Sequence, residues 1–156
     1  MNAAAARAHM SAPTQLTSLA RKAAAAHGLD PALVCAVIEQ ESAWNPWAMR
    51  YEPAFFTKYV APLYTNNKIS ASEAYARGFS WGLMQVMGQV ARENGFAEPF
   101  LSALCDPAGG LDIGCKVLRR KLDAMAGDTA RGLLAWNGGA NPAYPVQVLA
   151  RRAHYL

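Results

Sequence analysis

The clearest pattern in this sequence is a run of apolar residues at helical spacing that carries one acidic residue on its apolar side. Asp30-Pro31 predicts the helix start, because an Asp side chain caps free N–H groups and Pro fits the first turn. The apolar positions that follow recur at helical spacing: Leu33, Val34, Val37 and Ile38. At about 100° per residue, Glu41 falls inside this stripe and Glu39 falls on the opposite side. We therefore expect Glu39 to be a solvated surface residue and Glu41 to lie against the core.

The position of Glu41 also predicts a perturbed acidity. Trp44-Asn45-Pro46 ends the helix soon after it. Desolvation and the negative end of the helix dipole both favour the protonated form of a carboxyl group there. A carboxylic acid that stays protonated near neutral pH is what a glycosidase uses as its general acid. From the residues alone a second interpretation stays open, in which the helix end frays and Glu41 reaches water.

The rest of the chain is typical of short helices separated by turns. Apolar spacing, capping residues and Gly or Asn stops predict helices over residues 14–27, 53–60, 70–78, 86–93, 107–126 and 128–136, and from Pro145 onward. Strand-like alternation is absent apart from one short ribbon at most. No repeat or linker is visible. We therefore expect a mainly α, single-domain fold over residues 13–156.

Composition narrows the functional classes. The chain has 156 residues, is 53% hydrophobic and has a net charge of +4, which suits a polyanionic partner such as nucleic acid or an anionic cell wall. Charged residues make up only 17% and form no long basic run, which disfavours nucleic acid. No apolar run approaches the ~18 residues of a membrane span. Residues 1–12 lack the features of a signal peptide, so we expect a flexible arm or an expression scar, with Met10 as an alternative start.

Metal, nucleotide and triad chemistry are all disfavoured. No nucleophile elbow, P-loop or dinucleotide fingerprint occurs. Cys35 is expected to be a buried thiol, whereas Cys105 and Cys115 bracket a helix start and are either free or joined by a disulfide, which would require an oxidising compartment. The histidines are isolated in the sequence: His9, His27 and His154. We expect no metal and no cofactor.

Four short motifs occur in order along the chain. They are Glu41-Ser42 followed by Asn45-Pro46, then Gly82-Leu83-Met84-Gln85, then Ala135-Trp136-Asn137-Gly138-Gly139, and finally Tyr144 leading into a helix. Each motif is weak alone, but the series resembles the soluble-type lytic transglycosylases (the transglycosylase SLT domain, glycoside hydrolase family 23). These belong to the lysozyme-like superfamily, which also contains the goose-type lysozymes. The resemblance runs from about Leu16 to Tyr155 and implies a lysozyme-like helical fold.

The resemblance implies a role for Glu41 as the sole catalytic acid and base. It would protonate the β-1,4 glycosidic oxygen between N-acetylmuramic acid and N-acetylglucosamine, then take the proton of the muramic 6-hydroxyl. That hydroxyl closes onto C1 and leaves a 1,6-anhydro end. The acetamide of the substrate can stabilise the charged intermediate, so no protein nucleophile is required.

The resemblance also implies a set of substrate-binding residues: Ser42, Gly82, Met84, Gln85, Trp136, Asn137 and Tyr144. Gly82 to Gln85 would form a wall of the sugar cleft, with Met84 and Gln85 as contacts. Asn137 would border the cleft, and Tyr144 would point its hydroxyl towards the catalytic region. Simpler interpretations stay open, in which Met84 fills the core, Gln85 and Asn137 are polar residues at helix ends, and Tyr144 is a packed aromatic.

The sequence departs from the family pattern in two places. Trp136 stands where the family usually has Tyr, which keeps a flat stacking face and replaces a phenolic hydroxyl with an indole N–H donor. Residues 51–79 form an insertion relative to compact members, which should border the cleft. It carries Glu52 and Glu73.

A goose-type hydrolase benefits from a second acid that activates water. Glu52 is the better candidate, because a capping box already explains Glu73. The alternative for Glu52 is that it is only the N-terminal acid of the Pro53 helix, favoured there by the helix dipole.

We therefore expect a monomeric, metal-independent enzyme that cleaves peptidoglycan, acting on the bacterial cell wall as a phage endolysin or as an exported bacterial enzyme. Hydrolysis, as in a goose-type lysozyme, is the alternative outcome. The alternative of another class is a non-catalytic wall-binding or phage-tail structural domain. A nucleic-acid module is a distant third.

Overall fold

Helix α2 (Pro31–Ser42) lies in the core of the computed structural model, which describes residues 13–156. Asp30 caps it as predicted, accepting a hydrogen bond of 2.9 Å from the backbone N–H of Ala32. All residues from Ala32 to Ile38 are buried, so α2 is covered on every side rather than along one stripe. Helix α1 (Thr14–Ala26) packs against α2 and α7 (Pro107–Ala124), and α9 (Tyr144–Arg152) packs against α2 and α8 (Thr129–Trp136). We call α1, α2, α7, α8 and α9 the helical half.

A small antiparallel sheet lies next to the helical half. Its strands are β1 (Met49–Tyr51), β2 (Phe79–Trp81) and β3 (Val86–Met87), in the order β1-β2-β3. Met49 faces Trp81 across the first pair, and Ser80 faces Met87 across the second. The predicted helix over 86–93 was therefore wrong at its start, because 86–87 pair with β2 and α6 (Gly88–Glu93) begins after them. The mainly α fold with little sheet is confirmed.

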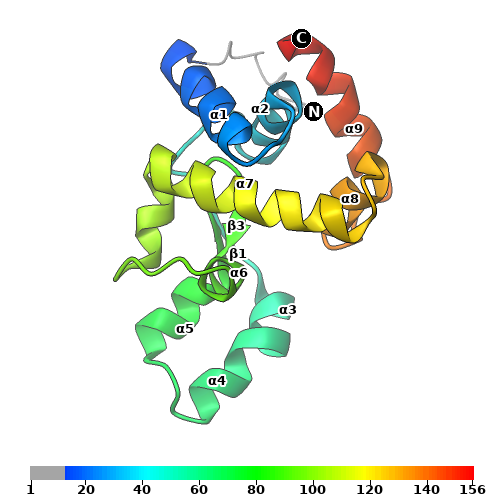
Figure 1. Ribbon diagram of the computed structural model, residues 1–156. Coiled ribbons are helices and arrows are strands. Elements are labelled where there is room, and N and C mark those ends of the chain that lie inside the picture. The colour runs from blue at the N-terminus through cyan, green and yellow to red at the C-terminus, as the bar shows by residue number, and fades with distance from the viewer. Residues whose placement is uncertain (1–12) are drawn as a thin grey trace, which may run out of the picture.

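A separate lobe lies on the side of the sheet that faces away from α1 and α2. It comprises α3 (Pro53–Phe55), the π-helical turn η1 (Phe56–Val60), α4 (Ala61–Thr65) and α5 (Ala71–Arg77). Figure 1 shows α7 crossing the middle of the molecule, with α1, α2 and α9 on one side and α3, α4 and α5 farthest away on the other. We call residues 52–78 the insertion lobe; its status as an insertion relative to compact family members stays a prediction.

The predicted helix boundaries in the lobe are only partly correct. Ser70 caps α5 as predicted, accepting a hydrogen bond from the N–H of Glu73 (3.2 Å), and Gly78 ends that helix. The helix predicted over 53–60 continues instead through η1 and α4 to Thr65. The 3₁₀ turns η2 (Leu101–Cys105) and η3 (Ala153–Tyr155) were not predicted.

All three cysteines are buried free thiols, so the Cys105–Cys115 disulfide, one of the two sequence alternatives, is not formed. Cys35, Cys105 and Cys115 pack as small apolar side chains in one core cluster. Burial raises the pKa of Cys35 to about 11 and that of Cys115 to about 12, which favours the neutral thiol. The predicted arm over residues 1–12 lies outside the described residues. Within residues 13–156, none of the helices combines the length and apolar character required to cross a bilayer.

Candidate active site

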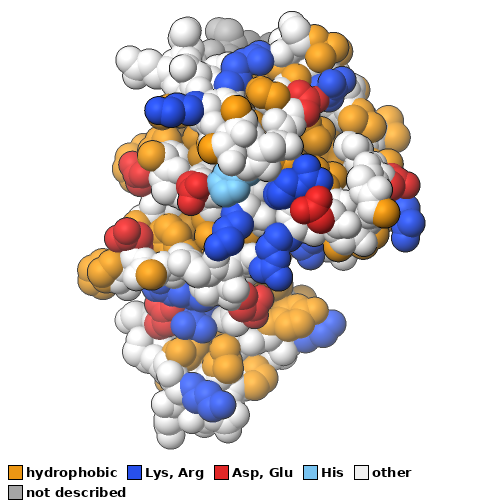
Figure 2. Space-filling view, in the orientation of Figure 1, with side chains coloured by type: hydrophobic (Ala, Val, Ile, Leu, Met, Phe, Trp, Pro, Cys, Tyr) orange, Lys and Arg blue, Asp and Glu red, His pale blue; other side chains and the backbone are white. Residues whose placement is uncertain are grey.

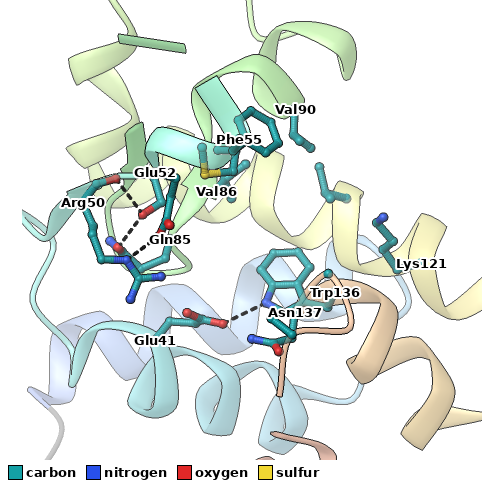
Figure 3. A pocket seen from close by; sticks show the side chains of 15 residues that line it. Glu41, Arg50, Glu52, Phe55, Gln85, Val86, Val90, Lys121, Trp136 and Asn137 are labelled. Atoms are coloured by element: carbon teal, nitrogen blue, oxygen red, sulfur yellow. Dashed lines mark hydrogen bonds and ion pairs between the residues drawn. The ribbon is translucent and has the colours of Figure 1, made fainter. Parts of the chain in front are cut away.

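Glu41 lines a cavity of about 360 Å³ between the helical half, the sheet and the insertion lobe. Figure 3 shows Glu41 and Trp136 on one side and Phe55, Val86 and Val90 on the other. The lining residues come from α2, the sheet, the lobe, α6, α7, the end of α8 and the loop that follows it: Glu41, Arg50, Glu52, Phe55, Ser80, Gln85, Val86, Met87, Val90, Val117, Lys121, Trp136, Asn137, Gly138 and Ala140.

Both hydrogen bonds to the Glu41 carboxyl group end on the same oxygen. The hydroxyl of Tyr144 donates to Oε1 at 2.6 Å, and the indole N–H of Trp136 donates to Oε1 at 3.1 Å. Tyr144 is buried at the start of α9, and Trp136 ends α8, so two helices remote in sequence fix this side chain. Among residues 13–156, no donor to Oε2 is found. Because two donors occupy Oε1, a proton on the carboxyl group resides on Oε2.

Burial raises the pKa of Glu41, in the direction expected from its place on α2. The two hydrogen bonds and the charge of Arg50 lower it but do not cancel the desolvation. Burial, together with the neighbouring Glu41, also raises the pKa of Tyr144, which therefore remains a neutral hydroxyl donor. The site thus holds an acid that keeps its proton to a higher pH than an exposed glutamate does.

The turn that ends α2 has an uncommon backbone held by the C-terminal residues. Ala43 (φ 50°) and Trp44 (φ 65°) are both in the left-handed region, which few non-glycine residues adopt. Trp44 is buried, and its indole N–H donates to the hydroxyl of Tyr155 at 2.9 Å. The Tyr155 hydroxyl donates in turn to Glu39 Oε2 at 2.7 Å. The prediction that Glu39 is solvated was wrong, because η3 and α9 cover that side of α2; its side chain is only 16% exposed and also meets Arg151.

Ser42 ties the end of α2 to the turn between β2 and β3. Its hydroxyl lies 2.8 Å from the carbonyl oxygen of Leu83 and 3.2 Å from that of Ile38, so it can donate to either. The side-chain amide of Gln85, which lines the cavity, donates to the carbonyl oxygen of Ala48 at 2.9 Å. Ser42 therefore positions the turn from the helix side, and Gln85 holds it from the sheet side.

Two residues of that turn, Gly82 and Met84, do not line the cavity, which corrects their predicted places in the wall. Gly82 has φ +69°, and a Cβ atom there would collide with the carbonyl oxygen of Leu104. Met84 is only 1% exposed and packs against Gly114 of α7. A Cβ atom added to Gly114 would lie 3.1 Å from the Cβ atom of Met84. Met84 is thus a core residue, which was the simpler interpretation of its position.

The two additional glutamates have different surroundings. Glu52 lines the same cavity as Glu41, and its Oε1 accepts a hydrogen bond of 2.5 Å from Nε of Arg50 (Figure 3). Glu73 lies outside the cavity lining and forms ion pairs with Arg77 and Arg92, both at 2.8 Å. The hypothesis that Glu73 activates a water molecule is therefore wrong; its carboxylate links α5 to α6.

The remaining lining residues include one predicted position and three that sequence reasoning missed. Asn137 lines the cavity, and its Oδ1 accepts from the N–H of Asn141 at 2.9 Å, which holds the loop after α8. Arg50, Phe55 and Lys121 also line it, and no spacing marked them. The aromatic content of the segment after α2 was the only available signal, and it did not single out Phe55. No group of three or more His, Cys, Asp or Glu side chains within residues 13–156 could hold a metal ion.

Comparisons with known proteins agree with this site. Residues 18–147 match the family model of the transglycosylase SLT domain. The chain is 28% identical to the membrane-bound lytic murein transglycosylase C of Haemophilus influenzae (strain PittGG) and 29% identical to that of Shigella sonnei. Each alignment covers 78% of this chain and 30% of the relative, so the chain spans less than a third of these relatives. No solved structure matches it significantly. Because the family model covers most of its length, the chain belongs to the transglycosylase SLT domain family.

Proposed function

We propose that this domain cleaves the β-1,4 bond between N-acetylmuramic acid and N-acetylglucosamine in peptidoglycan without consuming water, using Glu41 as its only acid and base. The observation that carries the proposal is the partly buried Glu41 carboxyl group on the cavity, held through one oxygen by Trp136 and Tyr144. Membership of the SLT family and relatives named as lytic murein transglycosylases support the substrate class.

The proposed reaction moves one proton through Glu41 and returns it. The Oε2 proton passes to the glycosidic oxygen as the bond from C1 to that oxygen breaks, which releases the N-acetylglucosamine hydroxyl. The substrate's acetamide stabilises the charge that develops at C1. The muramic 6-hydroxyl oxygen then bonds to C1, and its proton passes to Glu41. The product carries a 1,6-anhydro ring, and Glu41 is protonated again for the next cycle.

Trp136 and Tyr144 serve this cycle as positioning residues. Between the two proton transfers Glu41 is a carboxylate, and the donations from the indole and the phenol then become charge-assisted and stronger. Burial favours the return of the proton. Trp136 stands where the resemblance to the family leads us to expect Tyr, and its indole N–H donates directly to Glu41.

The charge distribution suits a polyanionic wall. Figure 2 shows Lys and Arg side chains gathered across the middle of one face, over α7, a helix that carries Lys116, Arg119, Arg120 and Lys121. Together with the net charge of +4, these cations favour docking on an anionic surface. We place the domain at the bacterial cell wall, delivered by a phage or exported, and acting as a monomer.

A hydrolytic outcome is the second candidate, because Glu52 lines the same cavity and is the carboxylate that could activate water. We rank it second because one Glu52 oxygen is engaged by Arg50 at 2.5 Å. A non-catalytic wall-binding or phage-tail domain is the third, and the burial of Glu41 argues against it, since a binding protein gains nothing from a desolvated acid.

The deciding experiment is mass spectrometry of the soluble products that the domain releases from purified peptidoglycan. We expect 1,6-anhydro-muramic ends from the wild type and from Glu98→Gln, a matched change of an exposed glutamate outside the cavity. Glu41→Gln should fold and lose activity by roughly 10²- to 10⁴-fold. Reducing ends, heavier by one water molecule, would show hydrolysis and direct attention to Glu52→Gln. A folded wild type that releases nothing would overturn the enzymatic proposal.

A further inference from the structure

We propose that Phe55 and Tyr59 of the insertion lobe form an aromatic platform on which a sugar of the glycan strand stacks, so that the cleft extends beyond the catalytic cavity and favours long strands. The proposal rests on the proposed function, because it takes the glycan strand as the occupant. It concerns how the strand is held and assigns no step of bond cleavage to either ring.

The platform is continuous with the catalytic cavity. Phe55 lines that cavity on the lobe side, away from Glu41 (Figure 3). Its ring centroid lies 4.8 Å from that of Tyr59, with an angle of 49° between the rings. The Tyr59 residue is 50% exposed. An aromatic surface therefore leads from the cavity to open solvent, where a strand leaving the active site would pass.

The packing of the lobe does not account for these two rings. Phe56 serves that purpose: it stacks on Tyr75 at 5.4 Å and 11°, and lies 5.8 Å from Tyr51. Gly78 makes room for Phe56, since a Cβ atom there would lie 2.8 Å from Cδ2 of its ring. Phe55 and Tyr59 pair with each other and take no part in these contacts of Phe56. The lobe is thus held by Phe56, and its two neighbours at the cavity and at the surface remain available.

The backbone between the two rings supports the same interpretation. Phe55 ends α3, and Tyr59 lies in η1, a single π-helical turn. Turns of this kind are rare and occur often at functional sites. Here the turn keeps residues 55 and 59 side by side while Val60 packs inward and is fully buried.

The surface chemistry fits a peptidoglycan strand. One face of a pyranose ring presents C–H groups, and stacking it on an aromatic ring removes apolar area from water on both partners. The Nζ atom of Lys58 lies 4.9 Å from the centroid of the Tyr59 ring. Its charge suits a strand whose peptide stems carry carboxylates. The combination of rings and one cation distinguishes this surface from the cation-rich face of α7.

The test compares long glycan strands with a tetrasaccharide as substrates of the wild type, Phe55→Ala, Tyr59→Ala and Tyr59→Phe. We expect Tyr59→Ala to raise KM on long strands roughly five- to tenfold with kcat little changed, and to lower the ratio of kcat/KM between long and short substrates. Tyr59→Phe should restore most of the loss, because it keeps the ring. Tyr64→Ala is the matched control, since Tyr64 is 43% exposed on α4 but lies outside the cavity lining and the Phe55–Tyr59 pair.

Two results would overturn the platform. One is a Tyr59→Ala variant that cannot be distinguished from Tyr64→Ala on long strands. The other is an equal loss on long and short substrates, which would indicate a structural role. The affinity of long strands for Glu41→Gln, with and without Tyr59→Ala, measures the contribution of the platform to binding in the absence of cleavage. If the wild type cleaves nothing, the proposed function fails, while a weaker binding of the double variant would still support the platform.

Discussion

The helical half and the insertion lobe face the same cavity but are stabilised in different ways. In the helical half, seven successive residues of α2 are buried, and α7 buries eight more. In the lobe, the fully buried side chains within its helices are Val60 and Ala74. Aromatic pairs and the ion pairs of Glu73 hold it instead. Elements with little buried apolar surface open more easily than core helices.

This difference suggests that the two regions have separate roles at the site. Glu41, which we propose as the catalytic acid, comes from the helical half, where Trp136 and Tyr144 both donate hydrogen bonds to it. The contacts that we propose to the glycan strand come from the lobe, which buries fewer side chains than the helical half. The predictions below test this division, beginning with the largest expected effect.

The first prediction breaks the core of the helical half. Met84→Ala should lower the free energy of unfolding by about 2–5 kcal/mol, because it leaves a cavity against α7. Tyr64→Ala in the lobe should cost no more than about 0.5 kcal/mol, because Tyr64 lies on the surface. Urea denaturation of both variants measures the contrast. Equal losses would show that the two regions do not differ as described.

The second prediction concerns the donors to the acid. Tyr144→Phe removes the 2.6 Å hydrogen bond to Glu41 and should lower kcat roughly 10- to 100-fold. Because that bond lowers the pKa of Glu41, its loss should move the alkaline limb of the pH–rate profile to higher pH. Kinetics from acid to mild alkali measures both effects. A lower rate with an unmoved limb would contradict the proposed contact in solution.

The third prediction uses the raised pKa of Glu41. The folded state binds this proton more tightly than the unfolded state, so the stabilising contribution is complete below the ordinary value of 4.5 and is lost as pH rises through the folded pKa. Glu41→Gln should therefore be more stable than the wild type near neutral pH, by roughly 1 kcal/mol, and about equal to it in acid. Thermal unfolding across pH measures the difference, and a less stable variant at neutral pH would contradict a desolvated acid.

The fourth prediction sharpens the comparison, since the pKa of Glu73 in the lobe is shifted in the opposite direction to that of Glu41. The hydrogen bond from Arg92, aided by Arg77, lowers its pKa. The stability it contributes is present above the ordinary value of 4.5 and is lost as pH falls through the lowered pKa. Glu73→Gln should cost about 1 kcal/mol at neutral pH and less in acid. The same pH series measures it, and a cost that is independent of pH would exclude the ion pairs as its source.

The sequence carried the outline of the helical half but not the contacts that complete the site. Spacing alone placed Glu41 against the core, because helical periodicity is a local property. It misjudged Glu39, because the cover over that side of α2 comes from η3, more than a hundred residues away. It left Met84 between two interpretations, since burial against Gly114 depends on how α7 crosses the sheet. β1 escaped notice because three residues are too few to show alternation.

The site shows the same limit. The sequence singled out Trp136 as a candidate site residue, but its indole N–H meets the same oxygen as the Tyr144 hydroxyl only after α8 and α9 are in place. Arg50 and Lys121 line the cavity from elements whose sequences gave no sign of it. Short motifs in order identified the family, whereas long-range packing decides which of their residues touch the cavity.

The three cysteine thiols are an intrinsic probe of how often the protein core opens. Cys35, Cys105 and Cys115 are all buried in the same core cluster, and none is spent in a disulfide. A thiol-directed alkylating reagent can reach Cys35 and Cys115, both 0% exposed, only when that core opens, so their labelling rate reports this opening without any engineered probe; Cys105 is 6% exposed. Because the thiols lie in α2, η2 and α7, labelling with and without a bound glycan strand would measure how strongly the substrate closes the catalytic side of the molecule.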